Sequence, residues 1–207
     1  MSMIQIRDFR DEDCYGTLKI HDAFVYDFDE SIRASKFPML TDTSKATSMI
    51  EQRQINLAQC EGGTGHDNYL QGILVAFNMD ITVKALVEAE RYHFLDIVSS
   101  NSTMHRIVKF DMNDCYNPYV DQVMIGRMME LIEEYNENPT EENYLRVLYS
   151  NPCGFTYTIR FTTNYRQLKT IYKQRKNHKL PEWKWFCQWI EDLPHSYLIT
   201  REGKEAA

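Results

Sequence analysis

A stripe along one predicted helix limits what this chain can fold into. Residues 162–178 read TTNYRQLKTIYKQRKNH, and a helical period places Asn164, Leu168, Ile171 and Arg175 on one face. Leu168 and Ile171 are apolar and favour burial, so they carry Arg175 toward the interior with them. A buried guanidinium is costly unless an anion meets it. The sequence therefore predicts an anionic partner for Arg175.

Two kinds of anion would serve Arg175. One is an Asp or Glu of the chain itself, and the other is a ligand phosphate, which a guanidinium binds through two parallel hydrogen bonds. Arg166 lies on the opposite face of the helix, near Lys169 and Lys173. The helix would then present an anion-binding group on each side, as expected of a helix between two phosphate-bearing ligands.

The charge of the chain is unevenly placed. The formal net charge is −7, yet the segment from Arg160 to Lys184 holds eight Lys or Arg residues against one acid, Glu182. The other 15 of the 23 basic residues and 29 of the 30 acidic residues lie elsewhere. Such a segment suits an anion site on an acidic protein, or a basic helix neutralised by acidic groups of its own chain or of a partner.

Composition bounds the class of protein. Hydrophobic residues make up 43% and charged residues 26% of the 207 residues, which is ordinary for one globular domain with a sizeable core. No run approaches the roughly 18 apolar residues of a membrane span, and the N-terminal residues do not resemble a secretion signal. The five cysteines form no C-x-x-C pair, so we expect reduced thiols in a cytoplasmic protein and no metal site.

Patterns along the chain predict a mixture of helices and strands in one domain. Helices are expected at 44–59, 82–96, 119–135 and 138–152, and again from Pro181, with Thr140 as an N-cap and a weak helical signal at 13–24. Strands are expected at 69–79 and 154–163, with a glycine-rich loop at 61–67 and a polar, turn-rich stretch at 98–106. Lys84 and Glu88 are spaced to pair, and the tryptophans of the last helix are expected in the core.

The segment N-x-R-x-L-x6-R, formed by Asn164, Arg166, Leu168 and Arg175, resembles the late motif of flavin-dependent thymidylate synthases. The preceding strand, FTYTIRFTT, is similar to the strand before this motif in the family, and RVL at 146–148 looks like the family's arginine-bearing helix end. The resemblance covers about 43–193 and implies an α+β fold, a single domain with a small antiparallel sheet and several helices. Residues 1–42 form an N-terminal extension of unknown role, and 201–207 read as a tail.

The earlier motifs of the family are altered here. The order of a Gly-His loop, a strand and a helix is similar, although the family's loop serine is missing from His66-Asp67-Asn68. The family's R-H-R run, followed by a serine and a loop arginine, corresponds to ERYHFLDIVSSNSTMHR, where Arg91 and His93 are shifted against the pattern. Ser102, or one of the serines before it, and Arg106 would serve as the loop serine and arginine. The R-H-R motif is therefore not intact.

The resemblance implies a homotetramer that binds FAD and dUMP in sites shared between subunits, with methylenetetrahydrofolate as carbon donor and NADPH as reductant. The flavin carries the redox chemistry, and the protein supplies orientation and electrostatics. Flavin-binding roles are implied for His66, Arg91, His93, Asn164 and Arg166, and nucleotide-binding roles for Ser102, Arg106, Arg146 and Arg175. No side-chain nucleophile is implied, and no catalytic residue is assigned.

Other interpretations of these residues stay open. With an altered R-H-R run, the chain could be a non-catalytic homologue that senses or sequesters a nucleotide. The basic, aromatic segment 160–189 would suit single-stranded nucleic acid, although the net acidity disfavours a polyanion. His66 could be only a turn residue, Arg91 could pair with Glu88, and the serines of 99–102 could belong to an exposed loop.

Overall fold

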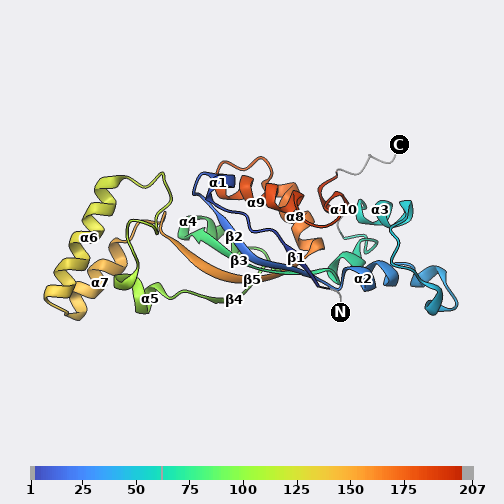
Figure 1. Cartoon of the computed structure of the whole chain (residues 1–207), viewed down its shortest axis with the longest axis horizontal. Helices are drawn as coiled ribbons and strands as arrows, with labels where there is room; N and C mark the ends of the chain where they lie inside the picture. Colours follow the sequence, from blue (N-terminus) through green and yellow to red (C-terminus); the bar gives the residue numbers. More distant parts are fainter. Residues whose placement is uncertain (1–2, 62, 202–207) are drawn as a thin grey trace.

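The computed structural model describes residues 3–61 and 63–201, and a five-stranded antiparallel sheet lies at its centre (Figure 1). The strand order is β1-β2-β3-β5-β4. The strands are β1 (Met3–Ile6), β2 (Lys19–Tyr26), β3 (Leu74–Thr82), β4 (Asp96–Ser100) and β5 (Thr156–Asn164). Strand β3 pairs with β5 along its whole length, from Leu74 opposite Asn164 to Thr82 opposite Thr156.

Helices and short turns connect these strands. The helices of the described residues are α1 (Asp11–Cys14), α2 (Phe28–Ala34), α3 (Gln52–Ala58), α4 (Val83–Ala89), α5 (Thr103–Arg106), α6 (Gln122–Glu137), α7 (Glu141–Ser150), α8 (Tyr165–Arg175), α9 (Pro181–Glu191) and α10 (Tyr197–Thr200). The 3-10 turns are η1 (Phe37–Met39), η2 (Thr43–Lys45), η3 (Asn68–Gln71) and η4 (Ile107–Lys109). The sequence prediction of an α+β fold with an antiparallel sheet is confirmed.

One face of the sheet is buried and the other is open. Along β3, the alternate residues Val75, Phe77, Met79 and Ile81 are buried, as the two-residue period of a strand requires. Helices α8 and α9 pack against this face (Figure 1). The residues between them, such as Asn78 and Asp80, are only partly buried and line the open face. The sheet is therefore covered by helices on one side.

Aromatic side chains dominate the main core. The ring centroid of Phe77 lies 4.8 Å from that of Trp189, 5.8 Å from that of Phe186 and 5.7 Å from that of Phe161. Helix α9 begins at Pro181. An N–H group in the first turn of a helix has no partner within the helix, so proline, which lacks this group, costs no hydrogen bond there. Full burial of side chains this large contributes roughly 2–3 kcal/mol each. The tryptophans at 183 and 189 are buried and Trp185 is partly buried, as the sequence predicts.

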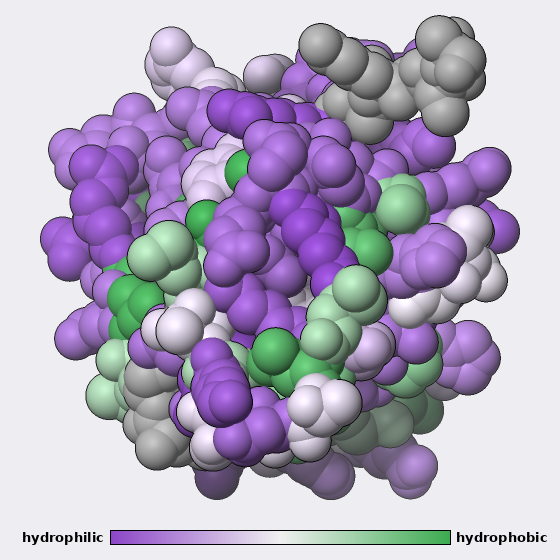
Figure 2. Space-filling view, turned by 90° about the vertical axis from the view of Figure 1, so that its right-hand side faces the viewer, coloured by the Kyte–Doolittle hydropathy of each residue, from purple (hydrophilic) through white to green (hydrophobic). Residues whose placement is uncertain are grey.

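A second, smaller core lies at one end of the molecule, where α6 and α7 pack together (Figure 1). Met128 and Leu131 of α6 meet Val147 of α7 there, with Phe155 closing the cluster. Helix α7 starts at the predicted place, because the hydroxyl of its N-cap Thr140 accepts a hydrogen bond of 3.2 Å from the backbone of Asn143. The opposite end carries α2, α3 and α10, and its surface is mostly hydrophilic with small hydrophobic patches (Figure 2).

The N-terminal segment, whose role the sequence leaves open, supplies strands β1 and β2 of the sheet. The weak helical signal at 13–24 is therefore correct only as far as Cys14, where α1 ends, and from Lys19 onward the chain is a strand. Asp22 has a positive φ of 50° at a bulge in β2, between His21 and Phe24. The extra residue breaks the alternation of buried positions that identifies a strand.

Several other predicted boundaries need correction. The helix expected at 44–59 exists only from Gln52, and the helix expected at 82–96 ends at Ala89. The turn-rich stretch at 98–106 begins instead inside strand β4, whose residues are all exposed. An exposed edge strand has no buried face to produce a two-residue pattern, so its pairing with β5 alone defines it.

Candidate functional site

The late motif lies where β5 ends and α8 begins. Asn164 is the last residue of β5 and the N-cap of α8, and its Oδ1 accepts a hydrogen bond of 2.9 Å from the backbone of Gln167. This bond satisfies one of the N–H groups that a helix start leaves free. The Nδ2 of Asn164 makes no hydrogen bond with the described residues. Asn164 therefore has a structural role and still has donors to offer.

Arg166 and Lys169, one turn apart on α8, both contact Asp67. The Nε of Arg166 lies 3.0 Å from Oδ1 of Asp67, and the Nζ of Lys169 lies 2.8 Å from its Oδ2. The Asp67 side chain is 1% exposed, whereas those of Arg166 and Lys169 are 26% and 20% exposed. The Nζ of Lys169 also donates to the carbonyl of Cys60, at 2.8 Å. The two ends of the loop are thus tied to α8.

The Oδ1 of Asp67 is near Arg166 without a well-aligned hydrogen bond. The distance between Oδ1 and Nε of Arg166 is short enough for an ion pair. Among the described residues, however, no donor is aligned well enough to form a hydrogen bond with Oδ1. We take the contact as Coulombic, because the attraction between charges depends far less on angle than a hydrogen bond does. Asp67 thus keeps one buried acceptor oxygen incompletely satisfied.

Glycines shape the loop that delivers Asp67. Gly63 and Gly65 have φ values of +94° and +78°, which other residues rarely adopt. His66 follows them and is exposed, so it lies on the surface beside a buried neighbour. Tyr69 donates to the carbonyl of Gln54, and burial, with the nearby charges of Tyr197 and Asp67, raises the pKa of its hydroxyl. Tyr69 therefore stays a neutral donor beneath the loop.

Arg175 finds its anion in the chain itself. Its Nη1 donates to Oε2 of Glu88 at 2.6 Å, and its Nε donates to the hydroxyl of Tyr92 at 2.7 Å. The guanidinium carbon lies 4.6 Å from the ring centroid of Trp183, a distance typical of a cation–π contact. The side chains of Arg175 and Glu88 are 14% and 22% exposed. The internal acid that the sequence allowed as a partner is Glu88. Neither Lys84 nor Arg91 forms an ion pair with Glu88 in the described part of the chain.

Glu88 gathers donors from α8, α9 and the turn between them. Its Oε2 also lies 3.1 Å from Nε1 of Trp183 and 3.3 Å from Nε2 of His178. The Nδ1 of His178 accepts from the backbone of Leu180, so a neutral ring carries its proton on Nε2, toward Glu88. One carboxylate thus joins α4, α8 and α9. The Nη2 of Arg175 remains without a partner among the described residues, so a phosphate contact stays a prediction.

A fourth cation of the basic segment also bonds within the chain. The Nη1 of Arg160 donates to the carbonyl of Asp22 at 2.8 Å and lies 3.3 Å from Oδ1 of Asn78. The Nδ2 of Asn78 in turn donates to the Asp22 carboxylate. This network crosses β5, β3 and β2 on the open face and holds the bulge. Four of the eight cations of the basic segment, Arg160, Arg166, Lys169 and Arg175, are therefore engaged by groups of the chain itself.

The residues of the altered R-H-R run are exposed. Arg91 and His93 lie in the turn between α4 and β4, and neither forms an ion pair with a described residue. The hydroxyl of Thr163 donates to the carbonyl of Phe94, which places this turn beside the end of β5. Arg91 and His93 thus lie at the same end of β5 as Asn164.

Ser102, Arg106 and Arg146 lie in the lobe of α5, α6 and α7. The hydroxyl of Ser102 caps α5, and Arg106 at the end of that helix is exposed. The Nη1 of Arg146 lies 2.8 Å from Oε2 of Glu134, and hydrogen bonds from Arg127 together with both arginine charges lower the pKa of that carboxyl.

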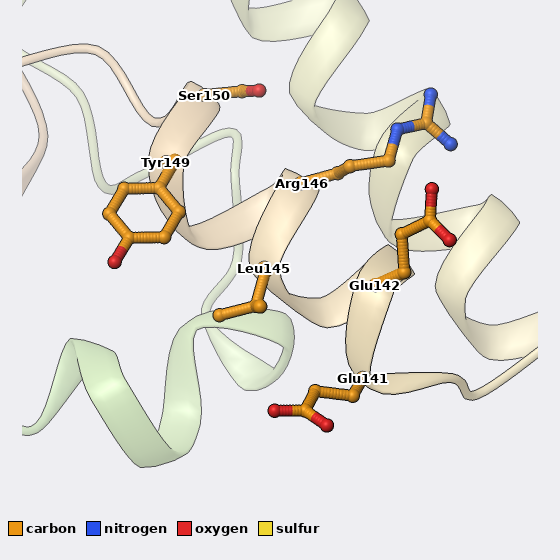
Figure 3. Close-up of a pocket in the computed structure, with 6 residues that line it drawn as sticks. All are labelled: Glu141, Glu142, Leu145, Arg146, Tyr149 and Ser150. Carbon is orange, nitrogen blue, oxygen red and sulfur yellow. The ribbon is translucent and has the colours of Figure 1, made fainter.

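An open depression of about 550 Å³ lies along α7 (Figure 3). It is lined by Glu141, Glu142, Leu145, Arg146, Tyr149 and Ser150. Arg146 and Glu142 extend to one side of the helix, toward α6, and Tyr149 extends to the other (Figure 3). The depression is thus a shallow helix surface that offers one predicted nucleotide contact.

One chain does not bring all the predicted residues together. Asn164 and Thr156 mark the two ends of β5, whose nine residues span about 27 Å at the usual rise of a strand. His66, Arg91, His93 and Arg166 lie toward the Asn164 end, and the lobe lies beyond Thr156 (Figure 1). Three of the predicted nucleotide contacts, Ser102, Arg106 and Arg146, therefore lie at the other end of β5 from the predicted flavin contacts. The fourth, Arg175, bonds instead to Tyr92, between Arg91 and His93.

Sequence reasoning missed the acids that meet the predicted cations. Asp67 carries no pattern that marks it as a partner, and the spacing of Glu88 indicated Lys84 or Arg91 instead of Arg175. Only the helix stripe signalled that Arg175 needed an anion. Burial disfavours stacking of nucleic-acid bases on the basic segment, because Tyr165 and Trp183 are buried and offer no free ring.

In 3–61 and 63–201, no helix is long and apolar enough to cross a membrane. In the same residues, no group of His, Cys, Asp and Glu side chains is placed to hold a metal ion.

The arrangement of helices and strands is the fold of flavin-dependent thymidylate synthases. The chain is similar to the ThyX enzyme of Helicobacter pylori, whose crystal structure was solved in complex with FAD and dUMP. The two share 13% identity with a TM-score of 0.65, over 88% of this chain and 97% of that chain. A second structure of this enzyme with FAD and dUMP shares 15% identity with a TM-score of 0.64, over 84% and 94%. The resemblance predicted from the sequence is confirmed for the fold.

Sequence comparison adds no further relative. No protein-family model matches the chain, and no curated protein matches it. The fit of a flavin therefore depends on the residues present. Among the described residues, Nδ2 of Asn164 and the two terminal guanidinium nitrogens of Arg166 make no hydrogen bond. These donors fit the polar groups of a flavin nucleotide, although the Asp67 carboxylate lies beside them.

Proposed function

We propose that this protein is a flavin-binding enzyme of the thymidylate synthase type, acting on dUMP or a related pyrimidine deoxynucleotide. Methylenetetrahydrofolate would donate the carbon and NADPH the electrons. The observation that carries the proposal is the fold shared with a protein solved with FAD and dUMP. Asn164 and Arg166 of the late motif support it, because both lie at the start of α8 with donors still free.

The chain's own residues would bind and orient the ligands. Asn164, Arg166 and exposed His66 would contact the flavin, which when bound supplies the redox chemistry. Arg91 and His93 would approach the flavin from the turn before β4. The nucleotide would be held by Ser102, Arg106, Arg146 and Arg175, the last through its remaining N–H groups. Cation contacts of this kind neutralise phosphate and fix its position.

We further propose a homotetramer with sites shared between subunits. Ser102, Arg106 and Arg146 lie at the other end of β5 from the predicted flavin contacts and from Arg175. This separation supports the proposal, since a second copy could bring the lobe of one subunit to the α8 end of another. Exposed apolar side chains near the edge strand also support it: Phe94, Ile97, Val98 and Met104 are 58%, 44%, 60% and 57% exposed. Such a patch is typical of a protein interface.

A second function is favoured by a different observation. Arg166 and Lys169 contact Asp67, and Arg175 contacts Glu88, so cations expected to bind ligands already have carboxylates. Together with the altered R-H-R run, this favours a non-catalytic homologue that binds a nucleotide as a sensor or sequesters it.

One experiment separates the two functions. The purified protein is mixed with FAD, the excess is removed, and the visible flavin absorbance is recorded. Retained flavin is followed by an assay for dTMP with dUMP, methylenetetrahydrofolate and NADPH, and turnover supports the enzyme. Binding of dUMP in calorimetry without flavin retention or turnover supports the non-catalytic homologue. Binding of neither FAD nor dUMP by a folded protein rejects both.

A further inference from the structure

Asp67 is the most buried charged partner in the candidate site. Its side chain is 1% exposed, and it meets two cations of α8. Removing a carboxylate from water is costly, and two nearby cations offset that cost. Asp67 therefore stands where a ligand anion would stand, between Arg166 and Lys169.

Asp67 is held less firmly than this burial suggests. Its Oδ1 lacks an aligned hydrogen bond, and only Oδ2 receives one, from Lys169. Lys169 has a second partner in the carbonyl of Cys60, so it would still hold the loop base if Asp67 moved away. Arg166 contacts Asp67 through Nε and keeps its two terminal nitrogens for another anion. The contact is thus built so that one anion can replace another.

We propose that Asp67 sets the ligand specificity of this site, as an internal counterion that a ligand phosphate must displace from Arg166 and Lys169. The inference rests on the proposed flavin-binding function. A phosphate that approaches the two cations meets the negative charge of Asp67 at short range, and this repulsion opposes binding. The site should therefore distinguish ligands that carry phosphate from ligands that do not. Asp67 weakens the binding of FAD, and it leaves the binding of riboflavin, which has no phosphate, unchanged.

The test compares FAD and riboflavin affinities, measured by flavin fluorescence, in the wild type and in variants. Asp67→Asn and the smaller Asp67→Ser should bind FAD about 10- to 100-fold more tightly, the effect of one close like charge. Riboflavin affinity should change less than about twofold. Asp67→Glu, which keeps the charge, should bind FAD as the wild type does.

The matched control is Glu30→Gln. Glu30 is an exposed carboxylate that pairs with Arg33 at 2.9 and 3.0 Å on α2, so its loss changes the net charge equally without touching the site. It should leave FAD affinity unchanged. Circular dichroism verifies that each variant is folded, and Asp67→Ser serves if Asp67→Asn does not fold.

The outcomes separate this inference from the proposed function. Equal or weaker FAD binding in the neutral variants, with FAD bound by the wild type, overturns the role of Asp67 and leaves the function intact. A parallel gain for riboflavin also overturns it, because that gain would not act through phosphate. If neither the wild type nor any variant binds FAD, the proposed flavin function is wrong. The role of Asp67 as a counterion is then tested by thermal melting of the wild type and Asp67→Asn with sodium pyrophosphate. Greater stabilisation of Asp67→Asn than of the wild type supports the counterion, and equal stabilisation overturns it.

Discussion

Two sets of cations matched by the family resemblance behave differently in this chain. Arg166 and Arg175 on α8 are mostly buried and contact Asp67 and Glu88, whereas Arg91 and Arg106, before and after β4, are exposed and make no ion pair with a described residue. Cations of the first set hold helices and loops together. The second set contributes little to the fold and is free for a ligand or a second subunit. The late motif thus supplies the fold-stabilising cations, and the altered R-H-R run with its loop supplies the uncommitted ones.

The largest expected effect is on the first set. Arg175→Ala should lower the free energy of unfolding by about 2–4 kcal/mol, because it leaves Glu88 partly buried without its cation and removes the contact with Trp183. Urea unfolding measures it. Lys173→Ala on the exposed side of α8 is the control, with a change below about 0.5 kcal/mol. If Arg175→Ala is as stable as this control and loses only nucleotide affinity, Arg175 is a ligand residue and the comparison fails.

A smaller effect is expected at Asn164, a neutral residue that both caps α8 and keeps Nδ2 for a ligand. Asn164→Ala should lower the free energy of unfolding by about 1 kcal/mol, since α8 loses its N-cap. Asn164→Asp keeps an oxygen for the cap but lacks Nδ2, so it should retain stability and lose FAD affinity. Urea unfolding and flavin fluorescence distinguish the two roles. Unchanged FAD affinity in Asn164→Asp would assign the residue to the fold alone.

Buried and exposed thiols extend the comparison to pH. Burial raises the pKa of the Cys187 thiol to about 12, from 9.0, despite the opposing charges of Arg175 and Lys176. Below pH 9 the thiol is protonated in the folded and in the unfolded chain. Above pH 9 the unfolded chain loses this proton first, so the contribution of Cys187 to the free energy of unfolding is lost as the pH rises toward 12. Between pH 8 and 10, the free energy of unfolding should fall by about 1 kcal/mol more in the wild type than in Cys187→Ala. Cys153 is exposed, so the free energy of unfolding of Cys153→Ala should fall over this pH range by the same amount as that of the wild type.

The smallest effect on stability is expected for the second set. Arg91→Ala and Arg106→Ala should each change the free energy of unfolding by less than about 0.5 kcal/mol, because exposed side chains without partners add little. Ligand affinity should respond instead, in flavin fluorescence for Arg91 and dUMP calorimetry for Arg106. A stability loss comparable to that of Arg175→Ala would remove the distinction between the sets.

Some of the fold could be predicted because local rules act alone. Thr140 and Asn164 cap helices through bonds to residues three positions later, and Leu168 and Ile171 are buried as their spacing predicts. Strand β4 could not be predicted from the sequence. Its exposed residues carry no two-residue pattern, and only its pairing with β5 defines it. Strand β2 was missed because the bulge at Asp22 interrupts its period.

The sequence by itself determined that a basic helix with a buried apolar stripe would need anions, and which family's fold would supply the frame. Only the tertiary structure decided that Asp67 and Glu88 are those anions. They lie 99 and 87 positions away from Arg166 and Arg175 in the chain. Local rules reach about one helical turn, whereas charge pairing between distant segments depends on how helices and loops pack. The chemistry of the site therefore depends on packing that no single segment encodes.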